Sequence, residues 1–227
     1  MLALQGDFHA HAKMLESLGA GVRYVRRPFD LHGLSGLVLP GGESTTLLKL
    51  MEKGAFAEAL CAFHAAGGAL FGTCAGMILL ARHVRAPAQR SLGLIDIDVE
   101  RNAYGRQIDS AEAEATWVAP ELLDGSAGWR AKTGGSALPL IFIRAPRLTR
   151  RGPGVVPLAR YREEDVLVGQ GRVLAASFHP EISGDTRVHR FFLRMAAEPG
   201  SMRSGDRLTV PTAGDTAASA VRGPQAR

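Results

Sequence analysis

The sequence predicts an α/β protein with a mostly parallel open sheet, flanked by helices, and an added antiparallel portion. Helical and strand-like segments alternate through the first half of the chain, as is typical of a parallel sheet covered by helices. The second half is richer in short apolar segments of strand length. A cysteine framed by small residues follows one predicted strand, and open α/β sheets usually carry their sites at such carboxyl ends.

In the first half, Asp7 can cap a helix that runs to Leu18 and ends at Gly19. Apolar runs bounded by glycine predict strands, and amphipathic runs after a capping residue predict helices. The elements expected in order are strand 21–25, strand 36–39, helix 45–53 capped by Ser44 or Thr45, helix 55–66, strand 69–71 and helix 75–81.

The second half is expected to contain strands 95–99, 113–118, 140–143, 155–158, 166–169 and 173–178. Gln170 and Gly171 between the last two strands predict a hairpin turn. Asp185 then caps a final helix. The apolar residues of this helix have the i, i+3, i+4, i+7 spacing of one buried face, and they are Val188, Phe191, Phe192 and Met195.

The composition predicts one globular domain and a tail. The 227 residues are 46% hydrophobic and 22% charged, which suffices for a full core. No apolar run approaches the roughly 18 residues of a membrane span, and no signal peptide is expected at Met1. The net charge of +5 includes no dense basic block, so nucleic-acid binding has little support. We expect a domain over residues 1–197 and a disordered tail over 198–227, which lacks apolar periodicity.

The cysteines and histidines outside the motifs below predict little chemistry. Cys61 lies in the predicted helix 55–66 and is expected to be a buried apolar group, so a reducing cytoplasm fits better than a disulfide. His9 and His11 are two positions apart on a predicted helix, hence on different faces, which argues against a metal pair. Surface or packing roles are expected for His9, His11, His32, His64, His83 and His189.

Cys74 carries the strongest chemical signal. Residues 71–76, Phe-Gly-Thr-Cys-Ala-Gly, have the form of a nucleophile elbow, in which side chains at the two glycine positions would collide with the turn. A free thiol titrates near about 8.5, and a helix N-terminus or a nearby imidazolium lowers that pKa. The backbone N–H of Ala75 is placed to donate to an oxyanion. A lone cysteine in an apolar stretch is more often an inert core residue, so a partner base is needed.

Residues 178–181, Phe-His-Pro-Glu, supply such a base. Pro180 disfavours helix for His179 and keeps the segment extended. Because residues i and i+2 of an extended chain face the same way, Glu181 can fix the tautomer of the His179 ring. Together with Cys74 the segment predicts a Cys-His-Glu triad for acyl transfer.

A glycine loop follows the predicted strand 36–39. Residues 40–46, Pro-Gly-Gly-Glu-Ser-Thr-Thr, let backbone N–H groups approach a ligand closely. A phosphate, an oxyanion and an amino-acid carboxylate are all compatible with this loop. A P-loop is disfavoured because the Gly-Lys-Ser/Thr ending is absent.

Taken together, Gly-Thr-Cys-Ala-Gly, Pro-Gly-Gly-Glu-Ser-Thr and Phe-His-Pro-Glu resemble the motifs of class I, triad-type glutamine amidotransferases, which have a flavodoxin-like fold. Three further segments are similar to those of one branch, the glutaminase subunits of pyridoxal 5′-phosphate synthase. They are residues 4–7 (Leu-Gln-Gly-Asp), 101–107 (Arg-Asn-Ala-Tyr-Gly-Arg-Gln) and 142–146 (Phe-Ile-Arg-Ala-Pro). The resemblance runs from residue 2 to about residue 197.

This resemblance implies a glutaminase that hydrolyses L-glutamine to L-glutamate and ammonia, with Cys74 as nucleophile, His179 as base and Glu181 as its partner. It implies delivery of the ammonia to a (β/α)₈-barrel synthase subunit that builds pyridoxal 5′-phosphate (vitamin B6), without cofactor, metal, membrane or nucleic acid. The backbone N–H groups of Gly42 and Ala75 would form the oxyanion hole. The implied glutamine-binding residues are Gly42, Glu43, Ser44, Arg101, Ile143 and Arg144. A guanidinium can bind a carboxylate through two parallel hydrogen bonds, which suits the two arginines.

The chain departs from the family pattern in three places. The family has several more apolar residues before Leu-Gln-Gly-Asp, so a shortened first strand is expected here. Ala111 stands where the family usually has an aromatic residue, and residues 125–138 form a longer loop than usual. None of these positions carries a predicted catalytic role.

Three alternatives stay open. A Cys-type α/β-hydrolase shares the elbow, but its acid precedes its histidine in the chain, whereas Glu181 follows His179. A degenerate domain kept only for docking is disfavoured by the complete triad. The histidine-pathway glutaminase is the nearest enzymatic rival, and residues 5–7 and 101–107 point away from it.

Overall fold

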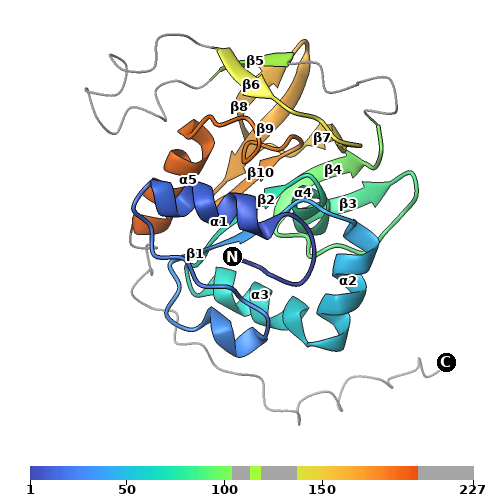
Figure 1. Cartoon of the computed structure of the whole chain (residues 1–227). Coiled ribbons are helices and arrows are strands. Elements are labelled where there is room, and N and C mark those ends of the chain that lie inside the picture. The colour runs from blue at the N-terminus through green and yellow to red at the C-terminus, as the bar shows by residue number, and fades with distance from the viewer. Residues whose placement is uncertain (104–112, 119–136, 199–227) are drawn as a thin grey trace, which may run out of the picture.

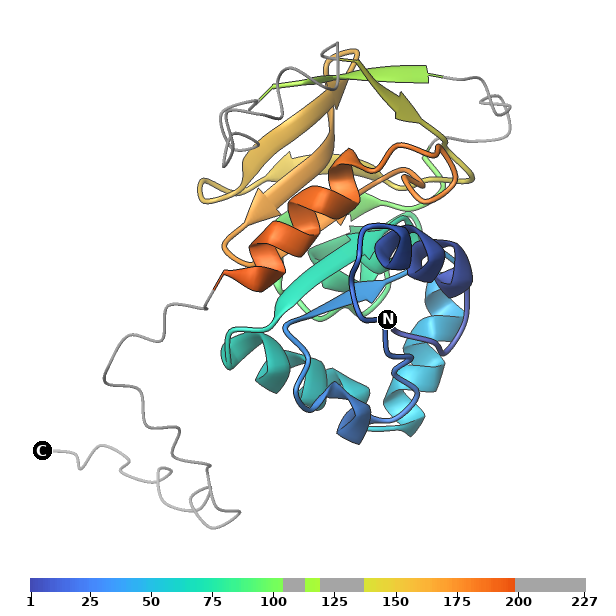
Figure 2. The same ribbon diagram turned by 60° about the vertical axis from the view of Figure 1, so that its left-hand side comes forward.

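The computed structural model describes residues 1–103, 113–118 and 137–198. Within these ranges the strands form a seven-stranded sheet in the order β1-β2-β10-β9-β8-β5-β6 and a three-stranded sheet in the order β3-β4-β7. The helices gather around the β1–β2 end of the larger sheet, and the antiparallel strands form the opposite end of the molecule (Figures 1 and 2). This is the predicted α/β class with an antiparallel addition.

The parallel part of the large sheet positions the predicted motifs. It consists of β1 (Gly36–Leu39), β2 (Ala69–Thr73) and β10 (Val173–Ala176), with β2 in the middle. Every residue of β2 and β10 is buried, as expected for parallel strands covered on both faces. Because Leu39 pairs with Gly72 and Ala176 with Thr73, the three strands end side by side. The glycine loop, Cys74 and the His179 segment therefore leave the same edge of the sheet.

The helices agree with the expected ones to within about two residues at each end. They are α1 (Phe8–Ser17), α2 (Ser44–Lys53), α3 (Phe56–Ala65), α4 (Ala75–Leu80) and α5 (Arg187–Ala197), with a short 3₁₀ helix, η1 (Pro28–Leu31). Asp7 caps α1 as predicted. The predicted cap of α2 was wrong, because Glu43 caps this helix with a carboxylate that accepts from the N–H groups of Thr45 and Thr46. At α5 the N-cap position is Thr186, which makes no side-chain hydrogen bond, and the predicted Asp185 accepts from the first helical N–H, that of Arg187, over 2.8 Å.

The antiparallel strands are β9 (Glu164–Gln170), β8 (Val156–Tyr161), β5 (Ala113–Trp117) and β6 (Ala137–Leu140). The predicted hairpin between β9 and β10 is confirmed: Gln170 pairs with Val173, and Gly171 has φ +54°, which favours glycine. The strand expected over 140–143 lies earlier, because β6 ends at Leu140. Residues 141–143 instead run toward the site, where the Ile141 carbonyl accepts a hydrogen bond from the His179 N–H over 2.9 Å.

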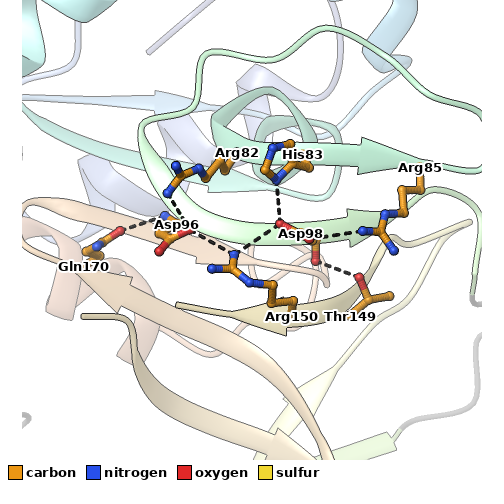
Figure 3. A network of polar contacts seen from close by, with 8 residues as sticks. All are labelled: Arg82, His83, Arg85, Asp96, Asp98, Thr149, Arg150 and Gln170. Atoms are coloured by element: carbon orange, nitrogen blue, oxygen red, sulfur yellow. Dashed lines mark hydrogen bonds and ion pairs between the residues drawn. The ribbon is translucent and has the colours of Figure 1, made fainter. Parts of the chain in front are cut away.

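The three-stranded sheet includes two strands that the sequence did not indicate. These are β3 (Ala81–Arg85) and β7 (Arg147–Arg151), which flank β4 (Ile95–Glu100). Charged side chains interrupt the apolar pattern of both strands, and those charges pair across the sheet. Figure 3 shows Asp96 and Asp98 of β4 among Arg82, His83 and Arg85 of β3 and Arg150 of β7. We call these six residues the surface charge network.

The strand expected over 21–25 was wrong, because only Val25 forms a bridge, to Leu2. The Leu2 N–H also donates to the Val38 carbonyl over 2.9 Å, so the start of the chain lies between β1 and Val25 without forming a regular strand. Cys61 is exposed rather than buried, because it faces outward from α3. Among the residues described, no helix is both long and apolar enough to cross a bilayer.

Several expectations fall outside the described residues. Residues 104–107 of one motif, the Ser110–Ala111–Glu112 position and residues 125–136 of the long loop are among them. So is the tail from residue 199 onward, so its expected disorder stays a prediction.

Candidate active site

Cys74 occupies a strained turn between β2 and α4. It is the N-cap of α4 and has φ +48° and ψ −103°, a conformation that a non-glycine residue rarely adopts. A Cβ on Gly76 would overlap the Leu39 carbonyl, and a Cβ on Gly72 would lie 2.6 Å from the Gly76 carbonyl group. Both glycines are thus required by close backbone packing, and the predicted elbow is confirmed in its geometry.

His179 and Glu181 form the expected pair. The His179 Nδ1 atom lies 2.8 Å from Glu181 Oε1, and the two side chains are 9% and 0% exposed. An ionised carboxylate only accepts, so Nδ1 carries the proton of this bond. The other ring nitrogen, Nε2, is left for Cys74, whose side chain interacts with the His179 ring and raises its pKa. Cys74 and His179 are 105 positions apart in the sequence, and the pairing of β2 with β10 brings their segments together.

The environment of His179 favours the imidazolium form. Burial by itself lowers the pKa of this ring, but the hydrogen bonds and charges of Cys74 and Glu181 outweigh burial and raise its pKa to about 10. At neutral pH the ring is therefore protonated and faces a sulfur atom. That pairing suits a thiolate–imidazolium nucleophile.

A cavity of about 400 Å³ opens beside the sulfur. Its walls come from the ends of β1 and β2, the start of α1 and the segments around residues 101, 143 and 179. Among the predicted site residues it is lined by Gly42, Glu43, Ser44, Cys74, Arg101, Ile143, Arg144 and His179. Glu181 lies behind His179 and Ala75 behind Cys74, so neither lines the cavity. The lining residues that sequence reasoning did not assign are Gln5, Asp7, Gly41, Ile78, Asn102 and Ile182.

Gln5 is the most informative of the missed residues. Its side-chain carbonyl accepts a hydrogen bond from the Glu43 N–H over 2.9 Å and thereby holds the glycine loop. A Cβ on Gly42 would lie only 2.6 Å from the same oxygen, so the loop and Gln5 are closely packed. Gln5 belongs to the Leu-Gln-Gly-Asp segment, which indicated the family resemblance but not a contact between Gln5 and the glycine loop.

Three predicted binding side chains are already engaged with protein groups. Glu43 caps α2, and although burial raises its pKa, the hydrogen bonds from Thr46 and Thr45 outweigh this effect and lower the pKa to about 2. Ser44 donates to Gln89 over 2.9 Å. Arg101 lies 3.2 Å from the Thr45 hydroxyl and 3.5 Å from the Glu43 carboxylate. A ligand would therefore meet mainly the backbone of residues 42–44 and the guanidinium groups at the cavity wall.

Two histidines expected to be surface or packing residues lie directly behind the triad. His11 of α1 and His189 of α5 are both fully buried. His11 Nε2 is 3.2 Å from Glu181 Oε2. Their spacing in the sequence, 178 positions, gave no sign of this contact.

Comparison with protein families matches residues 1–198 to the family described as SNO glutamine amidotransferase. The chain is 52% identical over 203 residues to the pyridoxal 5′-phosphate synthase subunit PdxT of Deinococcus radiodurans, covering 87% of this chain and 96% of the relative. It is 49% identical over 201 residues to the PdxT subunit of Koribacter versatilis, covering 88% and 96% of the two chains.

Solved structures agree with this relationship. A crystal structure of a glutamine amidotransferase superposes with a TM-score of 0.75 at 43% identity, covering 87% of this chain and 97% of that chain. The structure of PurLQS from Thermotoga maritima matches with a TM-score of 0.60 at 17% identity, over 86% and 95% of the two chains, and at that identity it shows the fold alone.

Proposed function

The chain belongs to the SNO glutamine amidotransferase family, and we propose that it is the glutaminase subunit of a pyridoxal 5′-phosphate synthase. The observation that carries the proposal is the pairing of Cys74, on a strained elbow, with a buried His179 held by Glu181 at the edge of a cavity. The substrate is L-glutamine, and the products are L-glutamate and ammonia for vitamin B6 synthesis.

The geometry supports the following first half-reaction. The Cys74 thiolate attacks the side-chain amide carbon of glutamine, and the carbonyl oxygen becomes an oxyanion that accepts hydrogen bonds from the backbone N–H groups of Gly42 and Ala75. His179, protonated at Nε2, gives that proton to the departing nitrogen. Ammonia leaves as the C–N bond breaks, and a γ-glutamyl thioester remains on Cys74.

In the second half-reaction His179 is neutral and accepts a proton from water. The water oxygen attacks the thioester carbon, the C–S bond breaks, and glutamate leaves with regeneration of the thiolate. Glu181 keeps the His179 ring in the tautomer that both steps need, since its carboxylate accepts from Nδ1 over 2.8 Å.

The cavity supports binding of the rest of glutamine as follows. Arg101 and Arg144 lie on its wall and suit the α-carboxylate, and the backbone of residues 42–44 approaches the amide end near Cys74. Ile143 lies beside Arg144, is 49% exposed, and covers the aliphatic stem. The Arg101 contacts with Thr45 and Glu43 hold that guanidinium in place before substrate arrives.

The partner that we propose is the (β/α)₈-barrel synthase subunit, which receives the ammonia. The exposed apolar side chains Ile143 and Ile182 both line the cavity mouth, so a partner that covers the mouth would bury them and shield ammonia from water. We also propose, from the predicted family behaviour, that the free subunit is weakly active until this partner docks.

The decisive experiment is ammonia release from L-glutamine by the purified chain, with and without the synthase subunit. We expect slow release alone, faster release in the complex, and none from the Cys74→Ala variant in either case. Full activity of Cys74→Ala would overturn the triad. Ester hydrolysis without glutamine hydrolysis would instead identify a Cys-type hydrolase.

A further inference from the structure

A buried chain of polar contacts continues past the triad, from Glu181 to the pair of histidines on α1 and α5. His11 Nε2 lies 3.2 Å from Glu181 Oε2 and 3.0 Å from the hydroxyl of Thr73, the residue before the nucleophile. His11 Nδ1 lies 2.9 Å from His189 Nε2. Both rings are fully buried, and they join two helices that lie beside each other in Figure 1.

The donors in this chain can be assigned from the groups present. A carboxylate only accepts and the Thr73 hydroxyl can accept, so a hydrogen on His11 Nε2 suits both groups that face it. His11 Nδ1 is then the acceptor, and His189 Nε2 donates to it. The remaining nitrogen, His189 Nδ1, is buried with no hydrogen-bond partner among the described residues, and a bare lone pair there costs less than a buried N–H or a buried charge. Both rings are therefore neutral.

The charges around the pair fit neutral rings. Burial is the main cause that lowers the pKa of both, to about 4 for His189, and the neighbouring His189 and His179 act on His11 in the same direction. Asp185 raises the pKa of His189 but does not offset burial. A neutral His11 lies against Glu181 without competing with His179 for its negative charge.

We infer that His11 is a positioning residue of the glutaminase site, and that His189 fixes its tautomer. Glu181 Oε2 is fully buried and accepts no hydrogen bond from the described residues, and His11 Nε2 lies 3.2 Å from it. The contact with His11 holds this carboxylate against His179, which in turn favours the imidazolium that pairs with the Cys74 thiolate. This inference rests on the proposed function, because it assumes that Cys74 works as a thiolate.

The test measures thiolate formation directly, without glutamine or a partner. Alkylation of Cys74 by iodoacetamide is followed against pH by mass spectrometry in the full chain, in a Cys61→Ser background because Cys61 is exposed and unpaired. His11→Leu removes the donor and fills the site with an apolar side chain. His11→Gln retains an N–H donor. We expect the midpoint of the alkylation profile to rise by about one pH unit in His11→Leu, which is about tenfold slower alkylation below the midpoint. His11→Gln should recover most of the parent profile.

Two matched controls separate this role from packing. His9 is an exposed histidine on the same helix, and Phe71 packs edge-on against both rings at 6.1 Å and 5.8 Å without a hydrogen bond to either. His9→Gln and Phe71→Leu should leave the midpoint unchanged, although Phe71→Leu lowers the melting temperature. A parent-like midpoint in His11→Leu, or an equal shift in Phe71→Leu, would refute the inference.

Two further variants keep the result decisive. If His11→Leu does not fold, His189→Leu provides the test. This variant removes only the outer donor and should slow alkylation by about threefold below the midpoint. An unchanged midpoint in His189→Leu would then refute the inference. Glu181→Gln separates the two proposals. A shift in Glu181→Gln without one in His11→Leu leaves the triad intact and rejects the role of His11, and no shift in Glu181→Gln rejects the triad itself.

Discussion

The molecule holds two polar networks that contrast in burial. The proposed catalytic network, which consists of Cys74, His179, Glu181, His11 and His189 and is called the catalytic network below, is almost entirely enclosed. The surface charge network of Figure 3 has one enclosed carboxylate, Asp98, and its cations on β3 and β7 are 46–70% exposed. Enclosed polar groups are costly unless satisfied, so they persist where they serve a function, whereas exposed ion pairs contribute little. The two networks should therefore respond very differently to single substitutions.

The largest effect is expected from the centre of the catalytic network. Glu181→Gln removes the negative charge beside His179 Nδ1 and adds an amide N–H that can donate to this nitrogen, so the ring can take the wrong tautomer, which in a comparable triad costs about 10⁴-fold in kcat. We expect glutaminase kcat in the synthase complex to fall by about 10³-fold or more, with KM changed little. Glu52→Gln, at an exposed ion pair with Arg90, is the control and should retain parent activity. A loss below tenfold in Glu181→Gln would mean that the carboxylate only packs.

Acid should separate the two networks next. An unfolded histidine takes up its proton near pH 6.5, whereas burial keeps the pKa of folded His189 at about 4. Between these values the unfolded state binds more protons, so the free energy of unfolding falls as the pH falls, by up to about 1.4 kcal/mol per pH unit for this residue. His189→Gln should flatten the slope by that amount in urea titrations at pH 4.5 to 6.5. Arg85→Ala, at an exposed guanidinium of the surface charge network, is the control and should keep the parent slope.

The same contrast explains what could be predicted from sequence. The elbow and the His179–Glu181 pair are local patterns: Gly72, Cys74 and Gly76 share one turn, and His179 and Glu181 are two positions apart. The glycine loop and the parallel strands were readable for the same reason, because apolar runs bounded by glycine mark them. All of these predictions needed neighbours in sequence only.

What was missed depends on contacts that the sequence does not display. His11 and His189 meet across 178 positions, and each alone fits an ordinary buried or exposed histidine. The strands β3 and β7 carry basic side chains that pair with the carboxylates of β4 between them, so the apolar alternation of a strand is absent from both. Gln5 lies in a segment that the family resemblance includes, but its hydrogen bond to the glycine loop depends on the packing of two turns that are 38 positions apart.

A smaller effect is expected at the one enclosed member of the surface charge network. Asp98 is 4% exposed, and His83, Arg85 and Arg150 surround its carboxylate at 2.9 to 3.5 Å. Asp98→Asn keeps the shape but removes the charge, and we expect a loss of about 1–2 kcal/mol in the free energy of unfolding by urea. Because the partner cations are exposed, the loss should shrink in 1 M salt. Glutaminase activity should stay at the parent level. A loss of activity would show that the surface charge network and the catalytic network are coupled.

The smallest effect should come from the rim of the same network. Arg82 is 57% exposed and contacts Asp96 over 3.2 Å, and Asp96 keeps a second guanidinium, that of Arg150, at 3.0 Å. Arg82→Ala removes a long side chain that must be ordered to make one screened contact, so the gain in entropy offsets most of the lost attraction. We expect the melting temperature to change by less than about 2 °C at 0.15 M salt, measured by circular dichroism beside Asp98→Asn. A shift in melting temperature as large as that of Asp98→Asn would show that the ions of this sheet act as one cooperative unit. Burial of a residue would then not predict the effect of its substitution in the surface charge network.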